Sequence, residues 1–253
     1  MKIKVMTFNL RTDTPVDGIN KFTERVDRVK EVIMNEDPDL IGFQEGKDSM
    51  REWLRNTLSD YCLFGCGRDK NYYGESTVIA VKKNKFEVIS MDNFWLSTNT
   101  ELPGSRFGID QSNCPRITTC VRLCAKEISA PFWFYNTHLD HKGSTARLLG
   151  STALMHDIAL RTRGEKYVLT GDFNALPDTR EIEFIVNAGA ADATATLGGT
   201  FHGFGRLENK IKIDYIFTNA DFDASESYVV EDNPVEGVYI SDHNPVCGFI
   251  ELN

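Results

Sequence analysis

Four apolar stretches of this chain share one feature, a polar side chain where the stretch ends. They are "KIKVMTFNL" (2–10) with Asn9, "PDLIGFQE" (38–45) with Glu45, "PFWFYNTHL" (131–139) with His138, and "KYVLTGDFN" (166–174) with Asp172. Between the first two stretches, and again between the last two, apolar residues recur every three or four positions, as in an amphipathic helix. The chain therefore reads twice as strand, helix, strand. Each unit predicts two strands in one sheet, covered by the helix.

The two helical segments are defined by the spacing of their apolar faces. These faces are Phe22, Val26, Val29 and Ile33 in the first segment, and Leu148, Thr152, Met155 and Ala159 in the second. A further helix is expected over about 179–188, ended by Gly189.

Additional strands are expected outside these units. We predict hairpin or meander strands in 76–97 and 116–127, and strands in 212–218 and 241–252. Many strands with about four helices favour an α/β (α+β) class. In this class, two mixed β-sheets pack face to face with helices on the outside, as a four-layer sandwich. We expect a single domain, 1–253.

Charge and cysteine content narrow the class of protein. The formal net charge of −9 argues against a surface built for indiscriminate binding to nucleic acid. The six cysteines form no CxxC pair, and the start "MKIKVMTFNLR" lacks the features of a signal peptide. We therefore expect reduced thiols in a cytoplasmic protein. No apolar run is long enough to cross a bilayer, so no membrane insertion is expected.

Polar residues gather at the ends of the predicted strands. Eight lie at or just past an apolar stretch: Asn9, Glu45, His138, Asp172, Asn174, Asp214, Asp242 and His243. Taken singly, each is explained better as a turn former, a helix cap or a local hydrogen bonder. As a set, they indicate a ligand site, because such sites lie at strand ends where loops diverge.

Two short motifs suggest the chemistry of that site. In "SDHNPV", a turn would bring Asp242 and His243 to one cavity. There a carboxylate binds a hard cation, and a histidine holds a phosphate or moves a proton. In "GDFN", Asp172 can orient or deprotonate a water molecule. Asn174 can hold that water or a phosphate oxygen without adding negative charge.

The ordered set of motifs resembles the endonuclease/exonuclease/phosphatase superfamily, which has the deoxyribonuclease-I-like fold. The matching blocks are "MTFNLR", "LIGFQE", "YYGES", "PRITT", "YNTHLDH", "LTGDFNALPD", "IDYIF" and "SDHNPV", spanning positions 6 to 246. The chain is most similar to bacterial members of unassigned substrate, which share "NLR", "FWLS", "TFHGF" and an "H…AR" segment. The resemblance implies a Mg²⁺- or Mn²⁺-dependent hydrolase of phosphoester or phosphodiester bonds that uses an activated water. Oxygen and amide ligands fit these cations better than zinc.

The resemblance also implies roles for individual residues. Metal binding would fall to Asn9, Glu45 and Asp242, and catalysis to His138, Asp172, Asn174, Asp214 and His243. Substrate binding would fall to Arg11, Glu75, Arg116 and His141. In the nuclease members the acid at the position of Glu75 orients a catalytic histidine, and the acid at Asp214 is hydrogen-bonded to the histidine at 243. Arg11 replaces an aspartate of the apurinic endonucleases, which puts a second protein-bound metal in doubt.

Two questions stay open at this level. The first is whether the chain is an enzyme or a non-catalytic binding domain. The intact set of acid, amide and histidine residues favours an enzyme. The second is the substrate: short or single-stranded nucleic acid, or small, lipid or sugar phosphates. Six cations in predicted loops would allow a nucleic-acid track if those loops ring the cleft: Arg68, Lys70, Arg106, Lys142, Arg206 and Lys210. We expect a monomer.

Overall fold

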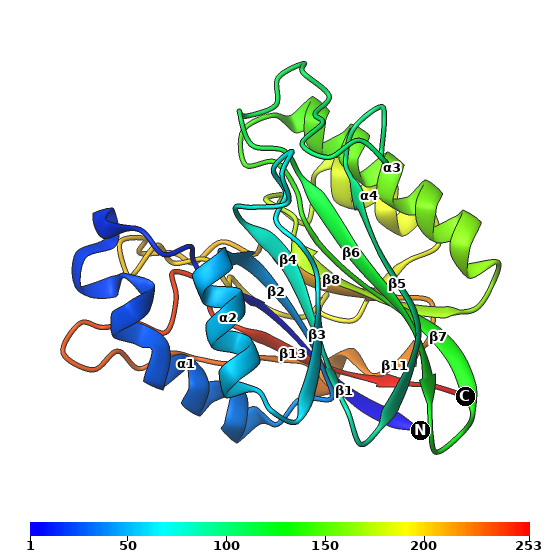
Figure 1. Ribbon diagram of the computed structural model, residues 1–253, viewed down its shortest axis with the longest axis horizontal. Helices are drawn as coiled ribbons and strands as arrows, with labels where there is room; N and C mark the ends of the chain where they lie inside the picture. Colours follow the sequence, from blue (N-terminus) through cyan, green and yellow to red (C-terminus); the bar gives the residue numbers. More distant parts are fainter.

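The computed structural model describes residues 1–253 as two β-sheets with helices along their outer faces (Figure 1). The first sheet has the strand order β11-β13-β1-β2-β4-β3, with β12 also paired to β13. Its strands are β1 (Lys2–Asn9), β2 (Leu40–Gly46), β3 (Tyr61–Phe64), β4 (Ser76–Lys82), β11 (Asp221–Phe222), β12 (Tyr228–Val229) and β13 (Val246–Glu251). Only β1 and β2 run parallel, so the first predicted strand–helix–strand unit is present in a mixed sheet.

The second sheet has the order β5-β6-β7-β8-β10-β9. Its strands are β5 (Phe86–Trp95), β6 (Ile117–Ala125), β7 (Ala130–His138), β8 (Lys166–Asp172), β9 (Ala191–Asp192) and β10 (Asp214–Thr218). Here β7 and β8 form the only parallel pair, which is the second predicted unit.

The helices lie on the outer faces of the sheets. On the first sheet they are α1 (Phe22–Glu36) and α2 (Asp48–Thr57), and on the second they are α3 (Ser144–Thr162) and α4 (Arg180–Asn187) (Figure 1). Short 3-10 helices cover Pro15–Asn20 and Ala224–Glu226. The expected end of α4 is found, because Gly189 takes the left-handed φ of +98°. None of the helices is both long and apolar enough to cross a bilayer.

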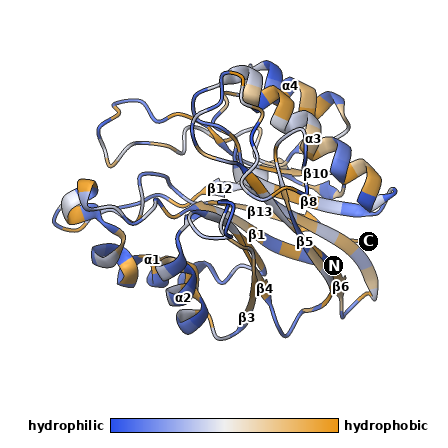
Figure 2. Ribbon diagram, turned by 45° about the horizontal axis from the view of Figure 1, so that its top comes forward, coloured by the Kyte–Doolittle hydropathy of each residue, from blue (hydrophilic) through white to orange (hydrophobic).

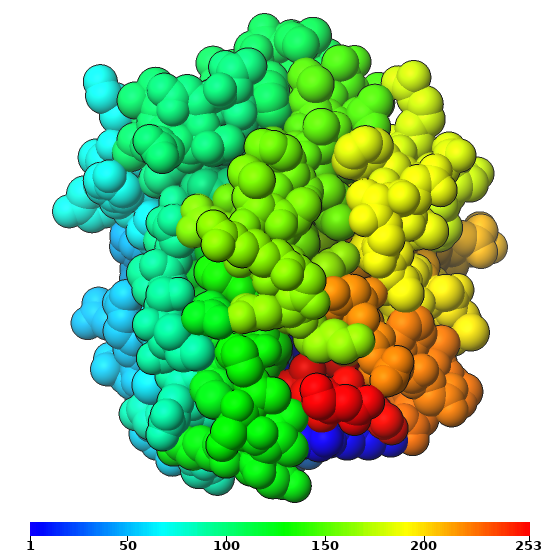
Figure 3. Space-filling view, turned by 90° about the vertical axis from the view of Figure 1, so that its right-hand side faces the viewer, coloured from blue at the N-terminus to red at the C-terminus, as the bar shows by residue number.

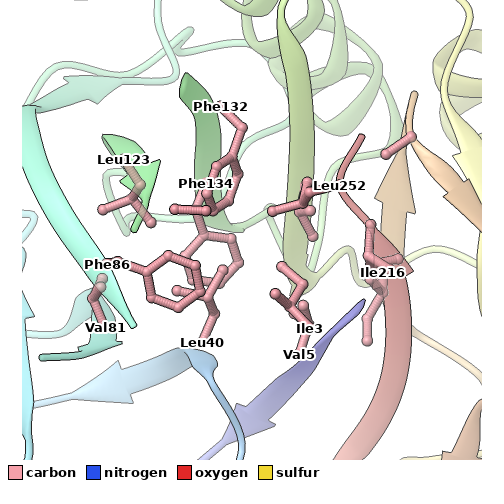
Figure 4. Close-up of a cluster of buried hydrophobic side chains, with 14 of the residues drawn as sticks. Ile3, Val5, Leu40, Val81, Phe86, Leu123, Phe132, Phe134, Ile216 and Leu252 are labelled. Atoms are coloured by element: carbon pink, nitrogen blue, oxygen red, sulfur yellow. The ribbon is translucent and has the colours of Figure 1, made fainter. Parts of the chain in front are cut away.

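Three apolar clusters join the layers. One lies between the two sheets and includes Ile3 and Val5 opposite Phe132 and Phe134 (Figure 4). A second packs α3 and α4 on their sheet, and a third packs α1 and α2 on theirs. Much of the apolar colour in Figure 2 follows the strands that build these interfaces. The predicted fold class, two mixed sheets face to face with helices outside, is confirmed.

The two ends of the described chain lie side by side. β1 pairs antiparallel with β13, and the amino group of Met1 donates to the Leu252 carbonyl at 2.7 Å. Figure 3 shows the corresponding blue and red segments in contact on one face. The first sheet is therefore completed by residues from both ends of the sequence.

A polar seam replaces the apolar cluster as the strands approach their ends. We use this name for Gly42, Gln44, Asn136 and Thr170, which lie between the sheets. Gln44 Nε2 donates to Asn136 Oδ1 at 2.7 Å, and Asn136 Nδ2 donates to the Phe43 carbonyl at 2.7 Å. A Cβ on Gly42 would lie 2.1 Å from Thr170 Oγ1, so only glycine allows the sheets to approach this closely.

Two expectations about local structure were wrong. The segment 76–97 is not a hairpin, because β4 and β5 belong to different sheets and the chain crosses between sheets at residues 83–85. The link at residues 83–85 is short and polar, as a hairpin turn is, but here it joins strands of two different sheets.

The apolar face of the second helix was also misplaced. Of its four expected positions only Met155 is buried, whereas Gly150, Leu154 and Ile158 face the sheet. Because Thr152 was counted as apolar, the expected apolar face was rotated about the helix axis away from the true one. The true face includes small residues that permit close packing, and a Cβ on Gly150 would lie 3.3 Å from a Leu139 methyl.

Candidate active site

Strand register aligns three functional side chains in a row. His138 is the last residue of β7, Asp172 the last of β8 and Asp214 the first of β10. The register pairs His138 with Asp172, and Asp172 with Asp214, on neighbouring strands. Paired residues on adjacent strands point to the same face of a sheet, so the three side chains lie together.

The facing sheet supplies Asn9 and Glu45. Asn9 is the last residue of β1, and the pairing of β2 with β4 shifts register between Phe43 and Gly46. This irregularity includes Glu45, whose φ of +63° is unusual for a non-glycine residue. Its carboxylate accepts a hydrogen bond from the Thr12 amide at 2.8 Å. Arg11 and Asn174, which border the same space, also have positive φ, at 53° and 47°.

These residues enclose one cleft of about 360 Å³ at the strand ends. Its lining residues are Arg11, Thr12, Glu45, Arg68, Glu75, Cys114, Arg116, His138, His141, Asp172, Asn174, Phe201, Arg206, Ile213, Asp242 and His243. Only three of the sixteen are hydrophobic, so the cleft is built for a polar or charged ligand.

Asp172 lies at the centre of a hydrogen-bond network in this cleft. Its Oδ2 accepts from Asn9 Nδ2 at 2.9 Å, and its Oδ1 accepts from the Asn174 amide at 2.9 Å. Burial, followed by the negative charge of Asp214, raises the pKa of the Asp172 carboxyl to about 7. A carboxylate with such a pKa is suited to accept a proton near neutral pH.

His243 lies between two carboxylates. Its Nδ1 is 2.8 Å from Asp214 Oδ2, which is the contact that the resemblance implies, and its Nε2 is 3.7 Å from Asp172 Oδ2. Burial opposes protonation, but Asp214 and then Asp172 outweigh it and raise the pKa of His243 to about 10. His243 is therefore an imidazolium at neutral pH. Thr200 Oγ1 donates to the same Asp214 oxygen at 2.5 Å and holds that carboxylate in place.

His138 has the opposite character. Burial, and next the charge of Arg116, lower its pKa well below the ordinary value, so the ring is neutral. Its Nε2 lies 3.0 Å from Asn174 Nδ2, and a neutral ring can accept this hydrogen bond. Asn174 Nδ2 also donates to the Leu139 carbonyl at 3.2 Å. No protein group donates to Asn174 Oδ1, which leaves this oxygen free for a water molecule.

The oxygen donors of Glu45, Asp242 and Asn9 fit a hard divalent cation. Burial opposes ionisation of Glu45, yet the Thr12 amide and Arg11 outweigh it and lower the pKa of the carboxyl. Asp242 provides a second carboxylate, 3.8 Å from Arg11 Nε. Asn9 Nδ2 is 3.3 Å from Glu45 Oε1, and its Oδ1 already accepts from the Arg11 amide. Carboxylate and amide oxygens are the donor set of Mg²⁺ or Mn²⁺.

A second group of side chains is also close enough to hold a cation. Asp172, Asp214 and His243 place one ligand atom each within 4.8 Å of one another. A proton on His243 Nδ1, shared with Asp214, satisfies the same atoms without a metal.

Two arginines also line the cleft. Arg116 precedes β6 and is 4% exposed, and its Nη2 lies 2.8 Å from His141 Nδ1. Arg68, in the loop between β3 and β4, forms a 2.7 Å ion pair with Glu75. Glu75 therefore contacts an arginine, and the structure shows no hydrogen bond between Glu75 and a histidine. The role that the resemblance implies for Glu75 stays a prediction.

The structure gathers all twelve residues singled out from the sequence. Ten of them line the cleft. The other two lie behind the lining, where Asn9 is hydrogen-bonded to Asp172 and Asp214 is hydrogen-bonded to His243. Lining residues that sequence reasoning did not assign are Thr12, Arg68, Cys114, Phe201, Arg206 and Ile213. Of these, Arg68 and Arg206 belong to the six cations in predicted loops. The other four loop cations, Lys70, Arg106, Lys142 and Lys210, do not line the cleft.

The two-sheet sandwich, with its polar groups at one set of strand ends, defines the deoxyribonuclease-I-like class of hydrolases. The chain belongs to the Endonuclease/Exonuclease/phosphatase family, whose sequence model matches residues 6–243. Members of this family act on phosphoester bonds, including those of nucleic acids, and generally use a divalent metal ion.

Three individual proteins are similar to the chain along almost its whole length. An endonuclease/exonuclease/phosphatase structure from Bacteroides vulgatus is 31% identical, covers 100% of both chains and has a TM-score of 0.89. A mannosyl-6-phosphatase from Bacteroides thetaiotaomicron is 26% identical, covers 98% of this chain and 100% of that one, and has a TM-score of 0.87. Protein L388 of Acanthamoeba polyphaga mimivirus is 24% identical over 275 residues, with 98% of this chain and 100% of that protein covered.

Proposed function

We propose that this protein is a Mg²⁺- or Mn²⁺-dependent hydrolase of small phosphate esters. The observation that carries the proposal is the position of Asp172, buried at the floor of a polar cleft between two amides and two histidines. A carboxylate in this setting is suited to remove a proton from water.

Glu45 and Asp242 would hold the metal ion, with Asn9 beside them. The ion, when bound, supplies positive charge to a phosphate oxygen and to the leaving group. Asn9 has a second role in this proposal, because its Nδ2 joins Glu45 to Asp172. The same side chain thus fixes the distance between the metal ligand and the base.

The protein groups around Asp172 would carry out the proton transfer and the charge stabilisation. Asn174 Oδ1 accepts a hydrogen bond from the water, and Asp172 takes its proton as the water attacks phosphorus. His243, held as an imidazolium by Asp214, donates to the phosphate oxygens as negative charge develops there. Burial lowers the pKa of His138 well below its ordinary value, so this ring is a weak base and does not compete with Asp172 for the proton.

A small substrate is favoured over a nucleic-acid strand for two reasons. Only two of the six loop cations line the cleft, so the cleft itself lacks most of the positive charge that a nucleic-acid track would use. Among similar structures, the protein from Bacteroides thetaiotaomicron is a mannosyl-6-phosphatase, and its chain covers 98% of this one. We therefore propose a phosphorylated sugar or a molecule of similar size.

A substrate panel tests the proposal. Sugar phosphates, nucleotides, phospholipid headgroups and short oligonucleotides would be incubated with Mg²⁺ or Mn²⁺, and phosphate release or strand cleavage measured. We expect turnover of a small phosphate ester that EDTA abolishes and that Asp172→Asn greatly reduces. Cleavage of oligonucleotides alone would overturn the choice of substrate. No metal-dependent turnover of any panel member would overturn the proposed activity.

A further inference from the structure

The lining of the cleft contains hydrogen-bond donors with no partner in the protein. Arg116 is buried, yet its Nε and Nη1 make no hydrogen bond. Asp140 Oδ2 lies 3.6 Å from Nε, which is an ion pair but not a hydrogen bond. Buried donors are rarely left unpaired in folded proteins, and those that are call for an explanation, such as a ligand.

A second arginine faces the same space. Arg68 contributes to the lining of the cleft beside Arg116, with a side chain that is 12% exposed. After burial, the charge of Arg68 is the largest influence that lowers the pKa of the Arg116 guanidinium. The carboxylates of Asp140 and Glu75 act in the opposite direction, and an anion placed between the two guanidinium groups would add to their effect.

The backbone of Arg68 is held rigidly in place. Its amide donates to the Glu75 carbonyl at 2.9 Å, and its carbonyl accepts from Trp95 Nε1 at 2.6 Å. Close by, Gly67 packs so tightly that a Cβ would lie 2.1 Å from the Tyr73 carbonyl oxygen. The Glu75 carboxylate then fixes the guanidinium through their ion pair. Arg68 is therefore presented to the cleft with little freedom to lose on binding.

The two arginines also line a second, much smaller hollow. This hollow, which Glu45, Glu75 and His138 line as well, measures about 10 Å³. Such a volume holds one water molecule at most. We expect a phosphate group held by the two arginines to direct its ester arm into the larger cleft, because a second arm could not enter this hollow.

We propose that Arg68 and Arg116 form a clamp for the terminal, dianionic phosphate of a phosphomonoester, and that Arg68 determines selectivity for monoesters over diesters. The planar donor groups of two arginines match the three free oxygens and double charge of a monoester better than the two free oxygens and single charge of a diester. This inference rests on the proposed function and names the substrate class of the same site.

A matched pair of substrates tests the selectivity. 4-Nitrophenyl phosphate and methyl 4-nitrophenyl phosphate share a leaving group and differ by one methyl group and one charge. We expect the parent protein to prefer the monoester. Hydrogen bonds to a charged group correspond to a factor of about 10–100, so Arg68→Ala should lower kcat/KM for the monoester by about that much. The change should appear mainly in KM, the diester should change less than about 3-fold, and Arg68→Lys should fall between parent and Ala.

Phosphate binding provides a readout that does not depend on turnover. Calorimetric titration of inorganic phosphate into the EDTA-treated protein should show binding that Arg68→Ala weakens by about 10-fold or more. Arg122→Ala is the matched control, because it breaks an Arg–Glu pair with Glu165 on a part of β6 that does not line the cleft. This control should bind phosphate as the parent does, and melting temperatures confirm that all variants are folded.

The outcomes separate the two proposals. If Arg68→Ala binds phosphate as tightly as the parent and keeps its ratio of monoester to diester activity, the clamp is wrong. A parent protein that prefers the diester also overturns it. If neither ester is hydrolysed but phosphate binding requires Arg68, the clamp stands and the proposed hydrolysis of small esters fails for these substrates.

Discussion

Asn9 donates a hydrogen bond to Asp172 at 2.9 Å and thereby joins the last residue of β1 to the last residue of β8. These strands belong to different sheets, so the contact crosses the central interface of the sandwich. One sheet carries the proposed metal ligand Glu45 and the other the proposed base. The geometry of the reaction therefore depends on how the two sheets are held together.

Replacement of the proposed base tests the mechanism directly. We expect Asp172→Asn to lower kcat by about 10² or more with little change in KM, because the carboxylate acts on water in the transition state. Asn174→Ala should be milder but should affect the same step, so the double variant should be strongly non-additive. Steady-state kinetics on the substrate found by the panel is the measurement. A raised KM with unchanged kcat would instead make Asp172 a substrate-positioning residue.

The same substitution should change how stability depends on pH. The folded pKa of Asp172, about 7, lies above the ordinary value of about 3.9, so the folded state holds the proton more tightly. Its contribution to the free energy of unfolding is therefore present at low pH and is lost as pH rises from about 4 to 7. In EDTA, Asp172→Asn should melt higher than the parent at pH 7 to 8, with the difference shrinking towards pH 4.

Asp140 provides a control, because its effect on stability should change with pH in the opposite direction to that of Asp172. Burial opposes ionisation of Asp140, but hydrogen bonds from the Gly143 amide and from Ser112 outweigh it and lower its pKa to about 2. Asp140 therefore stabilises the folded state above about pH 4, and this contribution is lost as pH falls towards 2. Asp140→Asn should melt lower than the parent at pH 7. Equal behaviour of the two variants across the pH range would contradict the assignment for Asp172.

Removal of the charge at Glu45 tests the metal site. Glu45→Gln keeps the size of the side chain but removes the carboxylate that Thr12 and Arg11 hold ionised. We expect loss of metal-dependent activity and clearly weaker Mg²⁺ binding by calorimetry, with an unchanged far-UV circular dichroism spectrum. Glu226→Gln, at a surface pair with Lys2, should bind Mg²⁺ as the parent does. If Glu45→Gln does the same, the ligand is another residue, and Asp172, Asp214 and His243 become the candidates.

The polar seam should be sensitive to a single methyl group. In Gly42→Ala the new Cβ would overlap Thr170 Oγ1 and Asn136 Oδ1, at 2.1 and 2.6 Å. Overpacking of this kind costs about 1–3 kcal/mol or more in the free energy of unfolding. Gly198→Ala is the matched control, because its Cβ would meet nothing within 4 Å. The midpoint of urea unfolding should fall for Gly42→Ala alone. An unchanged midpoint would show that the sheets separate easily at this point.

The sequence was informative about the inward faces of the strands. On β7, Phe134, Asn136 and His138 alternate along one face and pass from the apolar cluster through the seam to the cleft. An alternation of this kind can be read without a structure, because side chains on a strand repeat every two residues. The strand-end positions of His138 and Asp172 followed from the polar residues at which two of the apolar stretches end. The assignment of residues 1–253 to a single domain stays a prediction.

What the sequence could not show was any contact that depends on how loops fold. Arg68 was recognisable only as a cation in a loop, and nothing in "CGRDKNYYGES" indicates that it pairs with Glu75 and faces Arg116. The crossing from β4 to β5 was missed for a related reason. A three-residue link has the same composition whether it turns back within one sheet or leads to the other.

A left-handed backbone conformation, which residues other than glycine rarely adopt, is shared by Arg11, Glu45 and Asn174. Each departure from the favoured regions costs on the order of 1–3 kcal/mol, and the rest of the fold must compensate for it. Selection for stability alone would place glycine at these three positions and would remove the side chains that border the cleft. The most thermostable versions of this protein should therefore be found among its inactive ones, so a screen for heat resistance needs a simultaneous screen for turnover.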